Sequence, residues 1–148
     1  MGTRIVLDTN VLVAALRSSA GASHAILQRV HERKLTPLLS VPLLMEYEDV
    51  LKRPGLLPHL SESDIDVVLD QFASRAVEQR IYFAWRPFLP DPKDDMLVEL
   101  ALAGKASHVI THNVRDLTPA RKLGLRILTP RDFIAEATIH DIAYHPDS

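Results

Sequence analysis

Short apolar segments that alternate with amphipathic helical segments constrain the fold of this chain more than any other feature. The first apolar segment, Ile5-Val6-Leu7, predicts a buried strand, and a helical pattern follows it from Val11 to Leu16. Buried parallel strands typically read as such uninterrupted apolar runs. Strands that alternate with helices predict a parallel sheet covered by helices. We therefore expect an α/β protein, a three-layer α/β/α sandwich with a central, mainly parallel sheet.

The other predicted elements follow in the same order. Further strands are expected at Leu38–Leu39, Ile81–Phe83, Val109–Ile110 and Leu125–Leu128. Helices are expected from Ser23 to about Arg33, Pro42 to about Lys52, Ser61 to about Glu78, Met96 to Ala103 and Pro130 to about Ala137. The stretch from Pro87 to Pro92 predicts a loop. We expect one domain over residues 1–137 and a poorly ordered C-terminal tail over residues 138–148.

The composition supports one globular domain and excludes several kinds of chemistry. A chain of 148 residues with 47% hydrophobic and 24% charged residues is long enough to bury a core. Without cysteine it has no disulfide, thiolate zinc site or cysteine nucleophile. The seven histidines show no zinc-ligand spacing, and the five glycines form no phosphate-binding loop. No apolar run approaches the ~20 residues of a spanning helix, so we expect a cytoplasmic protein without a membrane anchor.

The charge of the chain is not that of a protein that coats nucleic acid. The formal net charge is −2, whereas binding through charge alone requires a strongly basic surface. Any contact with nucleic acid must therefore be local. The basic residues that we expect to line a groove are Arg17, Arg53, Arg86, Lys93, Arg115 and Arg121.

Two acidic residues follow predicted strands. Asp8 comes directly after the first strand, and Asp116 lies in the polar turn after Val109–Ile110. Ligands of open parallel sheets bind beyond the carboxyl ends of the strands, so both residues are expected at the same edge. The alternatives are ordinary ones, a helix N-cap for Asp8 and a turn residue for Asp116.

Further acidic residues lie on predicted helices. Glu46 falls at the edge of the apolar stripe of its helix, where the alternative role is a pair with an arginine. Asp91, Asp94 and Asp95 precede or begin the apolar helix, and spacing alone does not choose among them. A helix N-terminus also favours a negative charge for purely structural reasons. Carboxylates gathered in one place suit Mg²⁺ or Mn²⁺, which are hard cations that prefer oxygen ligands and often complete their shell with substrate phosphate.

Three segments, VLDTNVLVAAL, PLLMEYEDVLKRP and DPKDDMLVELALAGKASHVITHNVRDL, together resemble the PIN-domain family, especially its bacterial branch of toxins from toxin–antitoxin pairs. The resemblance spans about Arg4 to Phe133. It implies an α/β/α domain with a parallel sheet and a Mg²⁺- or Mn²⁺-dependent endoribonuclease site. It also implies an RNA substrate, a cognate antitoxin protein that inhibits the enzyme, and a homodimer.

Position by position, the resemblance selects Asp95 over Asp94. It implies that the catalytic, metal-binding residues are Asp8, Glu46, Asp95 and Asp116. Its auxiliary polar positions correspond to Thr9, Asn10, Thr111 and Asn113. Many members carry an aspartate where this chain has Asn113, a departure that implies a weaker second metal position.

The sequence thus supports the hypothesis of a ribonuclease in which divalent ions activate water to attack an RNA phosphodiester. One alternative is a non-catalytic RNA- or protein-binding module that retains the PIN fold. Another is a phosphate-transferring hydrolase with Asp8 as covalent nucleophile. Asn10 argues against it, because such enzymes use a second aspartate at that position as their acid.

Overall fold

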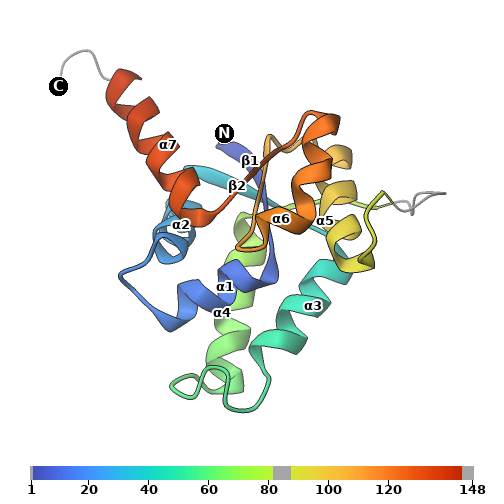
Figure 1. The fold of residues 1–148 in the computed structure, drawn as a ribbon. Helices are drawn as coiled ribbons and strands as arrows, with labels where there is room; N and C mark the ends of the chain where they lie inside the picture. The colour runs from blue at the N-terminus through green and yellow to red at the C-terminus, as the bar shows by residue number, and fades with distance from the viewer. Residues whose placement is uncertain (1, 82–87, 145–148) are drawn as a thin grey trace.

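The computed structural model describes residues 2–81 and 88–144, and the side chains among them up to residue 138. Its centre is a five-stranded sheet with the strand order β3-β2-β1-β4-β5, and all four strand pairings are parallel (Figure 1). The predicted fold class is confirmed. The strands are β1 (Thr3–Leu7), β2 (Leu35–Leu39), β3 (Val77–Glu78), β4 (His108–Ile110) and β5 (Arg126–Leu128).

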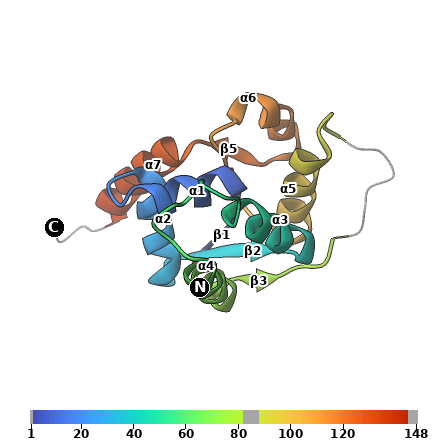
Figure 2. The same ribbon diagram turned by 90° about the horizontal axis from the view of Figure 1, so that it is seen from below.

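Helices cover both faces of this sheet. They are α1 (Thr9–Arg17), α2 (Ala22–His31), α3 (Val41–Leu51), α4 (Glu62–Arg75), α5 (Pro92–Ala103), α6 (Val114–Leu117) and α7 (Pro130–Tyr144), with a 3₁₀ helix η1 at Thr118–Leu123. From β1 the chain builds outward to β2 and β3, and α5 then returns it to β4 on the other side of β1. Because parallel crossovers are right-handed, α1–α4 and α5 cover opposite faces. Figure 2 shows β1 and β2 between α2 and α5, and α7 packs beside α2.

The central strands are buried on both faces, as their apolar sequences predict. Ile5, Val6, Leu38, Val109 and Ile110 have no exposed surface. Removing such residues from water is the main favourable contribution to folding. No helix within the described part of the chain is both long enough and apolar enough to cross a bilayer.

The predicted position of the third strand was wrong. The strand lies at Val77–Glu78, where it pairs with Leu38–Leu39, and α4 ends before it at Arg75. The helical pattern of α4 continues into this short strand, so periodicity alone extended the helix through Glu78. Ile81 is not in a strand, and the rest of that predicted segment lies outside the described residues.

Other boundaries also differ from prediction. Ser23 does not cap α2, because Gly21 is the N-cap and Ser23 is buried within the first turn. Helix α7 continues past Ala137 to Tyr144, across the predicted boundary between domain and tail. The division at residue 137 stays a prediction. Helices α6 and η1 were not predicted, because they are short and lack an apolar period.

Candidate metal-binding site

The carboxyl ends of β1 and β4 form the centre of the candidate site. These strands are neighbours in the register Leu7↔Ile110, and the strand order reverses between them. Such a switch point leaves a crevice where ligands of parallel α/β sheets bind. The backbone N–H of Asp8 donates to the Ile110 carbonyl at 2.9 Å, and Thr111 Oγ1 donates to Asp8 Oδ2 at 2.7 Å. Asp8 and Thr111 therefore meet as the predicted topology requires.

Asp8 occupies the N-cap position of α1 without acting as a side-chain cap. Its carboxylate makes no capping hydrogen bond to the helix, and Asn10 Nδ2 approaches Oδ2 at 3.4 Å. Burial raises the pKa of Asp8, and the nearby charge of Glu46 raises it further, while the hydrogen bond from Thr111 lowers it. A partly buried carboxylate beside a second one favours a cation or a proton.

Glu46 reaches the same crevice from α3. Thr9 Oγ1 donates to Glu46 Oε2, and Lys93 Nζ lies 3.7 Å from Oε1. The Glu46 side chain is only 16% exposed. Its cationic partner is thus a lysine from α5, and the arginine pair considered as an alternative does not form among the described residues.

Tyr47, the next residue, holds α3 against the end of β1. Its hydroxyl donates to the Leu7 carbonyl at 2.5 Å, and the whole side chain is buried. Burial raises the pKa of Tyr47 well above its ordinary value, and the charges of Asp8 and Glu46 add to this effect. Sequence reasoning placed Tyr47 in the apolar stripe but missed this positioning role, because a tyrosine in such a stripe does not reveal where its hydroxyl points.

The acidic residues at the start of α5 have separate roles in the structure. Asp91 is the N-cap, and its side chain accepts a hydrogen bond from the backbone N–H of Lys93 at 2.9 Å. Asp95 Oδ1 accepts from the backbone N–H groups of Phe88 at 2.9 Å and Leu89 at 3.0 Å. These contacts give Asp95 a structural role in holding the preceding loop.

Asp94 lies close enough to other carboxylates for their charges to raise its pKa. Burial, followed by the charges of Asp91, Asp8, Asp116 and Glu46, raises its pKa from 3.8 to about 6. Which of Asp94 and Asp95 is the acidic group that α5 contributes to the site stays a prediction.

Asp116, at the start of α6, is connected to the site through Asn113. Asn113 Nδ2 donates to Asp116 Oδ2 at 2.7 Å, and the Asn113 backbone N–H donates to Thr111 Oγ1 at 2.9 Å. Thr111 in turn donates to Asp8. Asn113 thus places a neutral donor beside Asp116, where an aspartate would add a repelling charge.

A cleft of about 680 Å³ opens at part of this site, and neither Asp94 nor Asp116 lines it. Asp8 and Glu46 line it together with the cations Arg17, Arg53 and Lys93. Of the other basic residues proposed for a groove, Arg115 does not line this cleft, and Arg121 is committed to the Ile127 carbonyl at 2.8 Å. Arg86 lies outside the described residues.

The donor chemistry of the site fits a hard divalent cation. Carboxylate, hydroxyl and amide oxygens are the groups that bind Mg²⁺ and Mn²⁺. Burial is the largest cause of the raised pKa of Asp94, and the charges of the neighbouring carboxylates add to it. Among the described side chains, however, no group of three or more His, Asp or Glu residues lies close enough to hold one ion. An ion held by three or more of these carboxylates would therefore require their side chains to move together, whereas one held by one or two with water would not.

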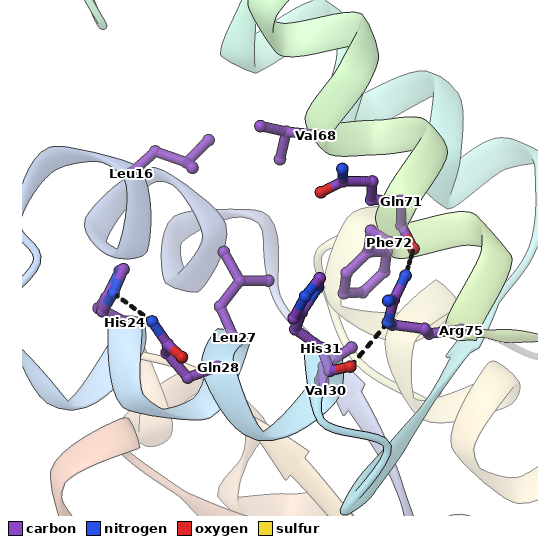
Figure 3. A pocket seen from close by; sticks show the side chains of 10 residues that line it. All are labelled: Leu16, His24, Leu27, Gln28, Val30, His31, Val68, Gln71, Phe72 and Arg75. Carbon is purple, nitrogen blue, oxygen red and sulfur yellow. Dashed lines mark hydrogen bonds between the residues drawn. The ribbon is translucent and has the colours of Figure 1, made fainter.

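A separate, mostly apolar pocket of about 220 Å³ lies between α1, α2 and α4 (Figure 3). Leu16, Leu27, Val68 and Phe72 supply apolar walls, and Arg75 Nε at its edge donates to the His31 carbonyl at 2.8 Å. No carboxylate lines it. This pocket is therefore distinct from the candidate metal-binding site.

The parallel sheet and the acidic cleft at its switch point define an α/β protein with a candidate cation site. The family model described as PIN domain matches residues 4–115, which is most of the chain. This chain belongs to the PIN-domain family.

Solved structures show the same fold. Twelve solved chains match, among them the crystal structure of VapBC2 from Rickettsia felis bound to a DNA fragment from their promoter. That match has a TM-score of 0.56 and 18% sequence identity, and it covers 84% of this chain and 97% of the other. No curated protein sequence matches this chain significantly. The likeness to VapBC2 establishes the architecture, because an identity this low carries no more.

Proposed function

We propose that this protein is a Mg²⁺- or Mn²⁺-dependent endoribonuclease, the toxin of a toxin–antitoxin pair. Membership of the PIN-domain family supports a nuclease. The observation that carries the proposal is the cleft at the carboxyl end of β1, which Asp8 and Glu46 line together with Arg17, Arg53 and Lys93. Carboxylates that crowd at a sheet switch point, under a cleft with cationic walls, suit a phosphodiester substrate and a divalent ion.

Asp8, Glu46, Asp94 and Asp116 are the residues proposed to hold the ion. Bound there, Mg²⁺ or Mn²⁺ supplies Lewis acidity for hydrolysis of a phosphodiester. The protein's own contribution is orientation. Thr111 holds Asp8 at 2.7 Å, Thr9 holds Glu46, and Asn113 holds Asp116 at 2.7 Å. Asp95, implied as a ligand by the resemblance, is proposed instead to position the segment at Phe88 and Leu89.

The cations of the cleft are proposed to bind the RNA backbone. Arg17 and Arg53 line the cleft, and guanidinium groups suit phosphate oxygens. Lys93 also lines it, 3.7 Å from Glu46. When an ion neutralises Glu46, the Lys93 ammonium group becomes available to a substrate phosphate. These contacts would bind RNA locally, and a net charge of −2 on the whole chain does not prevent such local binding.

The partners and cellular location are part of the same proposal. The matched structure is titled VapBC2 bound to promoter DNA, which supports a cognate antitoxin for this chain. We propose in addition a homodimer and a cytoplasmic location. Co-expression of the chain with a small neighbouring gene product, followed by size-exclusion chromatography with light scattering, tests both the antitoxin and the dimer.

An RNA cleavage assay tests the enzyme. We expect cleavage of single-stranded RNA with Mg²⁺ or Mn²⁺ and none with EDTA. Asp8→Asn is expected to abolish cleavage, whereas Asp70→Asn, which removes an exposed carboxylate of α4, is the matched control and retains it. Equal cleavage by Asp8→Asn would overturn the proposal. Absence of divalent-ion binding by calorimetry would instead favour the non-catalytic binding module.

A further inference from the structure

A second polar recess lies at the opposite edge of the sheet. Its volume is about 610 Å³, and its lining includes the first residues of four strands, namely Thr3, Leu35, His108 and Arg126. Since the strands are parallel, these residues mark the amino ends, whereas Asp8 follows a carboxyl end. The five residues of β1 separate the two edges by about 17 Å.

Positive charge gathers around this recess. Arg29, Arg33, Lys34 and Arg126 line it, and Glu136 is the acidic residue among its lining side chains. Glu136 is already paired, because Arg126 donates to both of its carboxylate oxygens at 2.5 and 2.6 Å. Lys34 Nζ lies 3.7 Å from Glu32 Oε1. The four cations of the lining still outnumber these two carboxylates, on a protein whose net charge is −2. Such a surface attracts anions.

Arg33 is a cation that the backbone does not require. It ends α2 in the left-handed region with φ of 63°, and its backbone N–H donates to the Val30 carbonyl at 3.0 Å. Glycine is the residue most at ease in this conformation after a helix. The positive charge at Arg33 is thus separable from the fold, since glycine would keep the turn and remove the guanidinium group.

His108 adds an unsatisfied polar atom to the wall. Its Nε2 is the one buried side-chain nitrogen or oxygen in the described structure without a hydrogen-bond partner, although Glu136 Oε1 lies 3.6 Å away. The ring is held edge-on against Phe133, with centroids 5.1 Å apart. Because this nitrogen is buried, a ligand oxygen would reach it only if the wall of the recess opened.

We infer that this recess is a second RNA contact, which binds a backbone phosphate of a strand that also enters the catalytic cleft. Arginine side chains favour phosphate because their N–H groups form paired, charge-assisted hydrogen bonds. The identity of the anion as RNA rests on the proposed ribonuclease function, whereas the cationic recess does not. The contact would increase affinity for long RNA and leave the reaction at the acidic cleft unchanged.

The test is RNA binding by fluorescence anisotropy in EDTA, over a range of salt concentrations, so that no cleavage occurs. The variant Arg33→Gly/Lys34→Ala removes two cations of the recess. The control Lys122→Ala/Arg131→Ala removes two exposed cations outside it. For a long single strand, the slope of log affinity against log salt is expected to fall by about 0.7 in the first variant, because the loss of one phosphate contact removes about 0.7. The control is expected to keep the wild-type slope.

Two further measurements separate a loss of RNA binding from a loss of folding or of catalysis. Thermal denaturation of the Arg33→Gly/Lys34→Ala variant is expected to show an unchanged or raised Tm. With Mg²⁺, its cleavage of an oligonucleotide too short to reach the recess is expected to equal that of the wild type. A wild-type slope in this variant, or an equal loss in the control, overturns the inference. Recess-dependent RNA binding without any cleavage would overturn the proposed function and leave the second contact standing.

Discussion

Two adjacent aspartates at the start of α5 differ in what they contact. Asp94 faces a cluster of like charges, whereas Asp95 accepts two backbone hydrogen bonds from the preceding loop. We expect Asp94→Ala to fold and to lower kcat about 10²–10³-fold, the range found when an electrostatic group of a site is removed. Asp95→Ala is expected to lower the free energy of unfolding by about 1–3 kcal/mol, because it leaves backbone donors unpaired.

Urea denaturation and steady-state cleavage kinetics, measured for both variants, separate these roles. Asp95→Ala should cleave RNA near the wild-type rate at a temperature where it is folded. If Asp95→Ala loses activity while fully folded and Asp94→Ala retains it, the assignment is reversed and the choice implied by the family resemblance is correct.

The raised pKa of Asp94 predicts a pH dependence of stability in the metal-free protein. Because the pKa is raised from 3.8 to about 6, the folded state holds the proton more tightly than the unfolded chain. The free energy of unfolding therefore falls as pH rises from about 3.8 to about 6. At neutral pH, Asp94→Asn is expected to be more stable than the wild type by on the order of 1 kcal/mol, since solvent screens part of the repulsion.

Urea titrations in EDTA at several pH values check this expectation. The difference between Asp94→Asn and the wild type should vanish below the lower end of that range, where the aspartate is protonated in both states. A constant difference at every pH would show that the substitution acts through packing and not through charge.

Sequence reasoning predicts the strand-end residues of the candidate site more directly than its helical aspartate. Asp8 and Thr111 follow apolar strands, and the topology alone places them at one edge. Asp91, Asp94 and Asp95 lie within two turns of one helix, and which of them faces the sheet edge depends on how α5 docks. That docking is a tertiary property that spacing does not encode.

At the scale of secondary structure, Tyr47 connects α3 to the strand that carries Asp8. Its hydroxyl donates to the Leu7 carbonyl, one residue before Asp8. Tyr47→Phe removes this bond and keeps the ring that packs edge-on against Phe72. We expect a loss of about 0.5–1.5 kcal/mol in the free energy of unfolding and a lower kcat with little change in KM, because Glu46 would lose its fixed position.

Chemical denaturation and cleavage kinetics of Tyr47→Phe measure these two effects. Phe72→Leu provides the comparison, since it removes the ring contact and leaves the hydroxyl in place. If both variants lose stability but keep kcat, the tyrosine hydroxyl serves the fold alone.

Long, strongly patterned elements were predictable, and elements defined by pairing were not. Strands β1, β4 and β5 and helices α1 and α3 fall where their apolar patterns predict, and α5 ends as predicted at Ala103 but begins four residues early, at Pro92. Strand β3 consists of Val77–Glu78 and exists through its hydrogen bonds to β2, so a helical pattern concealed it. Local sequence carries little information about a two-residue strand that depends on a partner.

At the scale of the whole molecule, the fold brings carboxylates from separate segments near enough to Asp94 for their charges to raise its pKa. A ligand that binds the folded state and not the unfolded chain stabilises the protein by RT ln(1 + [L]/Kd), which is about 2.7 kcal/mol at a hundredfold excess over Kd. If Asp8, Glu46, Asp94 and Asp116 share one ion, Mg²⁺ or Mn²⁺ is expected to raise Tm, and more so at neutral pH than near pH 4, where carboxylates are protonated.

Thermal shift measurements against divalent-ion concentration check this last expectation. Asp8→Asn should start from a metal-free Tm at or above that of the wild type, because it removes one repelling charge, and should show almost no shift with the ion. Asp70→Asn, which alters an exposed carboxylate outside the cluster, should shift like the wild type. An equal shift in Asp8→Asn would place the ion elsewhere on the protein. The described carboxylates form no ready-made group of three, so a shift restricted to the wild type and the control would mean that the ion itself draws these segments together.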